Sequence, residues 1–277
     1  MTVKPFLKWV GGKRQLLADI VPLVPDEFSR YIEPFVGGGA VFFHLSEQIT
    51  SQQIPSVIND INPELVNCYQ MVKTQTDDLI SLLKTHKHDK NYYLEIRNLD
   101  RQKGGLSVLS PLERASRFIY LNRTGFNGMY RVNSKGLNNV PFGRYKNPSI
   151  VNEDVLRASA KALIDTQISN QSFQDCLSNA RKGDFVYLDP PYVPLNDTSY
   201  FTSYMTNGFT MTDQKSLAAL VTELDKRGVV FVASNAFLPV VRELYHGFRQ
   251  IEVKAKRAIN SQGNKRSAIS ELLITNR

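Results

Sequence analysis

One tetrapeptide of the chain, Asp189-Pro190-Pro191-Tyr192, combines a carboxylate, two rigid residues and an aromatic ring. The Asp189 carboxylate can accept one N–H bond of an exocyclic amine, and the main-chain carbonyl of Pro190 can accept the other. Two such acceptors would localise the lone pair of a poor nucleophile, such as the N6 amine of adenine. Consecutive prolines would aim these acceptors in advance, and the face of Tyr192 could stack on an extruded base. The pattern therefore indicates methyl transfer to an amine by positioning.

The same tetrapeptide could be only a turn after a strand, since such sequences often form turns. Its position favours chemistry, because the apolar segment 184–188 predicts a buried strand that ends directly before Asp189. Open α/β sheets bind ligands at the carboxyl ends of their strands. The reaction needs no metal, and the two cysteines and four histidines lack the spacing of a zinc site. We therefore expect no metal in this site.

A glycine turn, Gly37-Gly38-Gly39, follows a predicted strand at 30–33 and precedes an apolar helix start at 40–45. This order is typical of half a nucleotide-binding βαβ unit. Phe42 stands where a dinucleotide fingerprint needs its third glycine, which disfavours a pyrophosphate cofactor and a nicotinamide-dependent reductase. A cofactor without phosphate, such as S-adenosylmethionine, fits the turn better.

Asp60 stands at the end of the next predicted strand, 23 residues after Gly37. A carboxylate there can accept hydrogen bonds from both ribose hydroxyls of an adenosine-containing cofactor. Asp60 could instead cap the helix predicted at 64–73, and Asn62 could do the same. The position alone leaves both interpretations open.

Alternating helices and apolar strands predict an α/β fold with a doubly wound, mostly parallel sheet. The last two strands could add an antiparallel edge, joined by the basic loop 260–266. Thr212 is the predicted N-cap of the helix at 212–227. The predicted strands are 30–33, 57–60, 167–173, 184–188, 228–233, 251–258 and 269–275, and the other predicted helices are 64–73 and 240–245.

The segment 74–152 is too long for an ordinary crossover and is predicted to be an inserted, mainly helical domain. Residues 1–73 and 153–277 would then form one discontinuous catalytic domain. Within 114–146 no Asp or Glu occurs, whereas seven basic residues are interleaved with six aromatic ones. The basic residues are Arg114, Arg117, Arg123, Arg131, Lys135, Arg144 and Lys146. The run predicts a DNA-binding surface, although a solvated charge is the alternative for each residue.

The whole chain has a net charge of +8 and a pI of about 9.4, which favours nucleic acid first and a membrane surface second as partner. The N-terminus lacks the features of a signal peptide, and no apolar run approaches the roughly 18 residues of a spanning helix. We expect a cytoplasmic setting and no membrane partner.

Five segments in a fixed order carry a family resemblance: 5–14, 33–39, 121–128, 140–146 and 189–192. Nearly end to end, the chain resembles the Dam-like DNA adenine-N6 methyltransferases, which act on GATC, including methylases of GATC restriction–modification systems. The resemblance implies a Rossmann-like methyltransferase fold with an inserted DNA-recognition domain. It also implies S-adenosylmethionine as cofactor, double-stranded DNA as substrate, base flipping, and a bacterial or phage-encoded enzyme.

The resemblance assigns residues to the cofactor and to the chemistry. Lys13 would lie near the cofactor carboxylate, Asp60 would bind the ribose, and Phe173, around the third strand, would border the adenine. Asp189 would contact both the methionine amino group and the target N6. The implied cofactor-binding set is Trp9, Lys13, Phe35, Gly37, Gly39, Asp60, Phe173 and Asp189, and the catalytic set is Asp189, Pro190, Pro191 and Tyr192.

The resemblance also assigns DNA contacts within and beside the insert. Arg131 would bind a guanine through two hydrogen bonds in the major groove, and Phe126 would fill the gap left by the flipped base. Phe126 departs from relatives that carry tyrosine there. Lys8 and Tyr145 would lie near the other guanine, Met129 and Pro141 near a thymine methyl, Asn127 beside Phe126, and Arg117, Arg123, Arg144 and Lys146 near phosphates.

Two other readings stay open from the sequence. The chain could be a DNA-binding relative that has lost catalysis, or it could methylate cytosine N4 or RNA adenine. A cognate restriction endonuclease could act on the same site without forming a stable complex with this chain.

Overall fold

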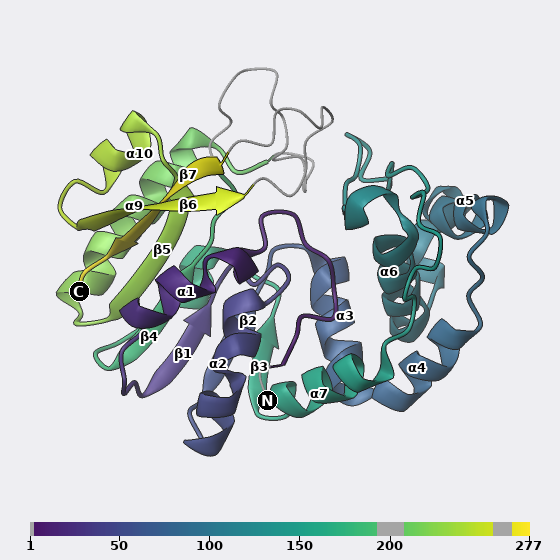
Figure 1. Cartoon of the computed structure of the whole chain (residues 1–277), viewed down its shortest axis with the longest axis horizontal. Coiled ribbons are helices and arrows are strands. Elements are labelled where there is room, and N and C mark those ends of the chain that lie inside the picture. Colours follow the sequence, from purple (N-terminus) through teal and green to yellow (C-terminus); the bar gives the residue numbers. More distant parts are fainter. Residues whose placement is uncertain (1–2, 193–207, 257–267) are drawn as a thin grey trace.

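The computed structural model describes residues 3–192, 208–256 and 268–277. Its centre is a seven-stranded sheet in the order β3-β2-β1-β4-β5-β7-β6 (Figure 1). The pairs among β1 to β5 are parallel, and β7 runs antiparallel to both β5 and β6. The strands are β1 (Arg30–Glu33), β2 (Ser56–Asn59), β3 (Thr166–Ser169), β4 (Asp184–Leu188), β5 (Val230–Ala236), β6 (Arg249–Lys256) and β7 (Ala268–Thr275). The predicted α/β sheet with an antiparallel edge is confirmed.

The central strand β4 is buried along its whole length because helices cover both faces of the sheet. Phe185 and Tyr187 face one apolar cluster, and Val186 and Leu188 face the other. This alternation follows from the two-residue period of a strand, and burial on both faces explains the continuous apolar run in the sequence. The strand therefore holds the following residue, Asp189, at a fixed place on the edge of the sheet.

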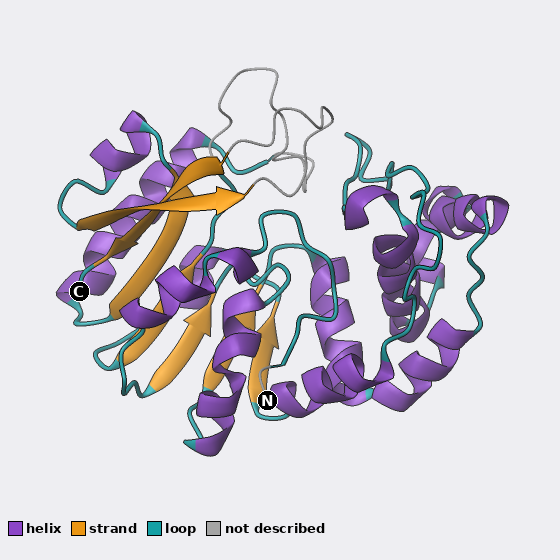
Figure 2. Cartoon of the chain, in the orientation of Figure 1, coloured by secondary structure: helices purple, strands orange, loops and turns teal. Residues whose placement is uncertain are grey.

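The sheet helices divide between these clusters (Figures 1 and 2). One face is covered by α1 (Leu17–Ile20), α2 (Ala40–Ser51), α3 (Pro63–Thr74) and α7 (Glu153–Leu163), and the other by α8 (Phe173–Leu177), α9 (Met211–Lys226) and α10 (Pro239–Leu244). Short 3-10 turns flank α1 at Lys13–Gln15 and Val21–Leu23. Among the described residues, none of the helices is long and apolar enough to cross a membrane.

Several predicted boundaries differ from the structure by one to four residues, for example at β5, which ends at Ala236 rather than at 233, and two differences change the role of a residue. The third strand ends at Ser169, and Phe173 begins helix α8, because the Ser172 side chain accepts the backbone N–H of Asp175 and caps that helix. Helix α9 is capped by Thr210 rather than Thr212, through a capping box with Asp213. The predicted basic loop 260–266 lies outside the described residues.

Residues 74–152 are mainly helical and lie beside the sheet (Figure 2). Helix α6 packs against α3, α4 and α5, so the segment contacts the sheet domain mainly through α3, the helix that follows β2. Its elements are α4 (Thr76–Lys84), α5 (Lys90–Asn98), η3 (Leu99–Arg101), η4 (Gly105–Val108), α6 (Pro111–Thr124) and η5 (Phe126–Gly128). After η5 the chain doubles back as a short hairpin, with an antiparallel bridge between Val132 and Asn138.

Candidate active site

The sequence motifs meet at one edge of the sheet. From β1 the chain proceeds to β2 and β3 on one side, whereas β4 and β5 lie on the other, so the topological switch point falls between β1 and β4. Open sheets of this kind bind ligands outside the carboxyl ends of such strands. The glycine turn follows β1, Asp60 follows β2, and Asp189 follows β4. The structure therefore brings the three predicted motifs to the same edge.

Asp189 is held by two side chains that sequence reasoning did not connect to it. Its Oδ1 atom lies 2.8 Å from Lys13 Nζ and accepts a 2.9 Å hydrogen bond from Ser234 Oγ on β5. Lys13 also donates to the carbonyl of Gly11 at 2.7 Å, and its side chain is 4% exposed against 21% for Asp189. Both contacts fall on the same carboxylate oxygen, which directs Oδ2 away from this pair.

Glu271, on the antiparallel strand β7, is a second carboxylate beside Lys13. Its Oε2 atom lies 3.9 Å from Lys13 Nζ and accepts a hydrogen bond from the Tyr192 hydroxyl. The Lys13 ammonium also lies 4.7 Å from the centre of the Tyr192 ring. Burial, with the nearby charges of Asp189 and Glu271, raises the pKa of Tyr192 well above its usual value, so the hydroxyl stays protonated. The sequence signal for Glu271 is that it is the one acidic residue in the segment 268–275.

The turn that contains the two prolines is fixed from behind by buried amides. Gln214 Nε2 on α9 donates to the Pro191 carbonyl at 2.9 Å, and Asn235 Nδ2 on β5 donates to Gln214 Oε1 at 3.1 Å. Both amide side chains are 1% exposed. These bonds and the fixed φ angles of proline stiffen the loop after β4.

Asp60 closes the glycine turn. Its Oδ2 accepts the Gly37 N–H at 3.1 Å, and its Oδ1 accepts the Asn62 N–H at 2.9 Å. The N-cap of α3 is Asn62, whose side chain accepts from Glu64 and Leu65, so the capping alternative for Asp60 is wrong. Desolvation raises the pKa of Asp60 from 3.8 to about 6, with the backbone donors opposing the shift.

Trp9 makes the close backbone approach that the glycine turn allows. A Cβ on Gly37 would lie 2.7 Å from Trp9 Nε1, and one on Gly38 would lie 2.9 Å from Trp9 Cβ. The indole also stacks with Phe118 and Tyr130, at ring-centre distances of 6.3 and 6.2 Å. The glycines therefore allow the indole of Trp9 to pack directly against the turn.

Phe35 and Phe173 pack together at a ring-centre distance of 5.5 Å, although Phe173 lies on α8 rather than on a strand. Phe209 completes the group at 5.8 Å from each of the other two rings. Gly39 has φ = +69°, and the Tyr69 hydroxyl beside it donates to the Gly37 carbonyl at 3.0 Å. Phe35 and Phe173 thus pack in the apolar cluster on one face of the sheet, whereas Trp9 packs in the cluster on the other face.

The N-terminal segment connects this region to the helical insert. The Asn122 side chain on α6 accepts the Lys8 N–H at 2.9 Å and donates to the carbonyls of Lys8 and Gly128 at 2.7 and 2.8 Å. The exposed Lys8 ammonium lies 4.2 Å from the centre of the Tyr145 ring. The structure therefore brings together the two residues that were predicted to share a guanine.

The remaining predicted DNA contacts lie around η5 and the hairpin. Phe126 is 44% exposed, and Arg131 is exposed with its Nε donating to Asn139 Oδ1 at 2.7 Å. Arg123 is half-buried and donates to the Phe6 carbonyl at 2.5 Å. Asn127, Pro141 and Arg144 are exposed, and Met129 is half-buried.

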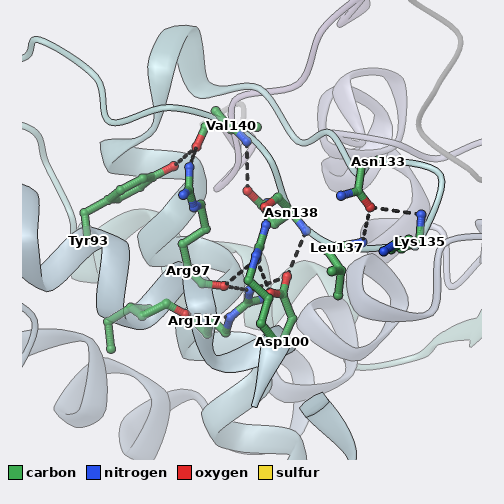
Figure 3. A network of polar contacts seen from close by, with 11 residues as sticks. Tyr93, Arg97, Asp100, Arg117, Asn133, Lys135, Leu137, Asn138 and Val140 are labelled. Carbon is green, nitrogen blue, oxygen red and sulfur yellow. Dashed lines mark hydrogen bonds and ion pairs between the residues drawn. The ribbon is translucent and has the colours of Figure 1, made fainter.

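Two arginines of the run 114–146, which contains no Asp or Glu, pair with acidic residues from outside the run. Arg117 is 5% exposed and pairs at 2.9 Å with Asp100 of η3 (Figure 3), and Arg114 pairs with Glu64 of α3. The prediction that Arg117 contacts phosphate is therefore wrong, because its guanidinium is buried in an internal ion pair. Spacing along the chain gave no signal of acids contributed from outside the run.

The comparisons with known proteins decide the family. A sequence model of the D12 class N6 adenine-specific DNA methyltransferases matches residues 9–259. The chain belongs to this family. It is a DNA adenine-N6 methyltransferase, so the predicted family, fold and enzyme class are confirmed. The alternative acceptors, cytosine N4 and RNA adenine, are set aside by this finding.

The methyltransferase has similar relatives in bacteria and an archaeon. It is 43% identical to the Type II methyltransferase M1.LlaDCHI of Lactococcus lactis subsp. cremoris, over 100% of this chain and 96% of that protein. It is 42% identical to the Type II methyltransferase M.MjaIII of Methanocaldococcus jannaschii, over 100% of both. It is 36% identical to the DNA adenine methylase of Escherichia coli (strain K12), over 98% of this chain and 94% of that protein.

Proposed function

We propose that the methyltransferase transfers a methyl group from S-adenosylmethionine to N6 of adenine in GATC within double-stranded DNA, after flipping the adenine out of the duplex. The observation that carries the proposal is the meeting of Asp189, Lys13 and Tyr192 at the end of β4, beside the turn closed by Asp60. The Asp189 carboxylate could then contact the cofactor and the target adenine at the same time.

The residues around the glycine turn fit S-adenosylmethionine. Asp60 offers a carboxylate at the end of β2, where ribose hydroxyls would meet it, and Trp9 and Phe35 offer flat apolar walls. Phe173 would border the adenine from α8, while Gly37 and Gly39 shape the turn and Lys13 would face the cofactor carboxylate. The bound cofactor supplies an electrophilic methyl group on a sulfonium.

The target amine would be held by two acceptors after β4. Oδ1 of Asp189 already carries Lys13 and Ser234, so Oδ2 is the oxygen that accepts one N6–H, and the Pro190 carbonyl accepts the other. The turn is stiffened by Pro191, whose carbonyl binds Gln214. Rigid placement of the amine by these acceptors would account for the rate once the cofactor supplies its methyl group, because positioning would replace a strong base.

Tyr192 provides the platform for the flipped adenine. Its hydroxyl is bound by Glu271 and its ring lies near the Lys13 ammonium, so the ring orientation is set before a base arrives. A base stacked on this ring would present its N6 amine next to Asp189. Phe126, exposed on η5, would fill the space left in the duplex.

The DNA surface is formed by the N-terminal segment, η5 and the hairpin. Arg131 would read a guanine through O6 and N7, and the Lys8–Tyr145 pair would contact the second guanine. Each residue that neutralises a phosphate adds about 0.9 to the salt slope of binding. The proposed DNA-binding set is Lys8, Arg123, Phe126, Asn127, Met129, Arg131, Pro141, Arg144 and Tyr145.

The acceptor and the motif are tested together by expressing the chain in cells that lack GATC methylation. Their DNA is then digested with two GATC endonucleases of opposite sensitivity to adenine methylation. The proposal predicts resistance to one nuclease and cleavage by the other. Cleavage by the nuclease that methylation blocks would overturn GATC, and sequencing the modified adenines would then give the true motif.

The Type II names of two relatives support a place in a restriction–modification pair. We infer that the chain protects cytoplasmic DNA of a bacterium or phage from an endonuclease that cuts the same site, without a stable complex between the two proteins. Premethylated plasmid should survive that endonuclease, and size-exclusion chromatography should show separate peaks. Co-elution of the two proteins would contradict the absence of a complex.

A further inference from the structure

The segment 138–140, which follows the turn of the hairpin, is anchored on both sides of Asn139, the residue that holds Arg131. Arg131 donates to the side chain of Asn139 at 2.7 Å and to its carbonyl at 3.3 Å. Directly after Asn139, the carbonyl of Val140 accepts from the Tyr93 hydroxyl at 2.9 Å and from Arg97 at 3.2 Å. Helix α5 thereby fixes the strand on one side of the Arg131 contact.

Asp100 fixes the other side. Its Oδ2 atom accepts the Asn138 N–H at 2.8 Å and an Arg117 N–H at 2.9 Å, as Figure 3 shows. Its Oδ1 atom accepts from Arg101, which also donates to the Asn138 carbonyl at 2.5 Å. Asp100 therefore binds the backbone of Asn138 directly and, through Arg101, a second time.

The ion pair beneath this contact is withdrawn from solvent. The side chains of Asp100 and Arg117 are each 6% exposed. Arg117 also donates to the carbonyls of Ile96 and Arg97 at 2.9 and 2.6 Å, so its guanidinium ties the end of α5 to α6. Hydrogen bonds to charged groups are stronger than neutral ones, and a buried pair has few alternative partners. The hairpin is thus held in one position relative to α5 and α6 by this buried ion pair.

We propose that Asp100 is a positioning residue for base recognition, which sets the place of Arg131 through Asn138 and Asn139. The inference rests on the proposed role of Arg131 as a guanine reader. Two simultaneous hydrogen bonds to one base demand a narrowly placed guanidinium. When the hairpin is released from Asp100, the Arg131 guanidinium can still donate two hydrogen bonds, but its position is no longer fixed by the hairpin backbone. Discrimination at that base position should then fall while catalysis at the cognate site persists.

The experiment measures methylation of a duplex library in which the positions flanking one target adenine are randomised. Wild type, Asp100→Asn and Arg131→Ala are compared, and sequencing of N6-methyladenine gives the preference at each position. We expect Asp100→Asn to lower the guanine preference by about tenfold or more at the position that Arg131→Ala also relaxes. Preference at the position assigned to Lys8 and Tyr145 should stay within about twofold of wild type.

Asp77→Asn is the matched control, because Asp77 also pairs with an arginine, Arg157, but is 79% exposed and far from the hairpin in the chain. It should leave every preference unchanged. The double variant Asp100→Leu with Arg117→Met removes both buried charges while filling their volume, which often preserves folding. It should still show the relaxed guanine position.

The outcomes separate the inference from the function on which it rests. If Arg131→Ala leaves every preference intact, the proposed reader is wrong. If Arg131→Ala relaxes one position and folded Asp100→Asn does not, the positioning role is wrong. Equal relaxation at all positions in Asp100→Asn would also overturn that role by showing a general loss of stability. Wild-type preference in the double variant would overturn it by showing that discrimination does not need the Asp100 carboxylate.

Discussion

Replacing Gly37 with alanine should damage cofactor binding through the indole of Trp9. Gly37 has φ = +46°, and the added Cβ would lie 2.7 Å from Trp9 Nε1. The left-handed backbone costs about 1–2 kcal/mol for a residue with a side chain. Forcing a methyl group against the indole adds about 1–3 kcal/mol. We therefore expect the free energy of unfolding to fall by about 2–5 kcal/mol.

Gly136→Ala separates the backbone cost from the clash. Gly136 has φ = +75°, but a Cβ there would meet nothing within 4 Å. This variant should lose only about 1–2 kcal/mol and bind the cofactor as wild type does. The assays are urea denaturation and calorimetric titration with S-adenosylmethionine.

For Gly37→Ala the dissociation constant should rise at least about tenfold, which corresponds to about 1.4 kcal/mol. Equal stability and equal cofactor affinity in the two alanine variants would refute the reasoning, since the Trp9 contact would then carry no energy.

Two further predictions concern half-buried carboxylates. Glu271→Gln should lower kcat about 10- to 100-fold in steady-state assays, since Tyr192 and Lys13 lose a charged partner worth about 1.5–3 kcal/mol. The control is Glu252→Gln on β6, where the side chain is exposed. Equal kcat values for the two variants would exclude a role for Glu271. Cofactor affinity should be full well above pH 6 and should fall as the pH drops through about 6, because the raised pKa of Asp60 leaves its carboxyl group protonated below pH 6. Calorimetric titrations with S-adenosylmethionine from pH 5 to 8 measure this dependence. An affinity that does not change with pH, or the same pH dependence in Asp60→Asn, would contradict the role of Asp60.

The edge of the sheet where Asp60 and Asp189 meet could be predicted, because the ends of buried strands can be located in the sequence. Buried parallel strands appear as apolar runs, and the residue after each run lies at the carboxyl edge. The sequence therefore predicts that Asp60 and Asp189 lie at the same edge of the sheet. The third strand ends before Phe173, because the cap at Ser172 starts a helix that buries the Phe173 ring.

The contacts between distant segments could not be predicted in the same way. Lys13 meets Asp189 and Glu271 only because the N-terminal segment and the antiparallel strand β7 converge on the end of β4. The basic run 114–146 suggested DNA contact for Arg117, but its partner Asp100 comes from η3, outside the run. The periodicity of a single sequence does not report such pairs.

The most direct test of the account is methyl transfer by Asp189→Ala in a single turnover at saturating S-adenosylmethionine and DNA. We expect a rate at least about 100-fold below wild type, because one of the two acceptors for N6 is lost. DNA affinity, measured by fluorescence anisotropy, should stay within a few-fold of wild type. An undiminished transfer rate in this variant would contradict the central claim that the Asp189 carboxylate positions the adenine amine.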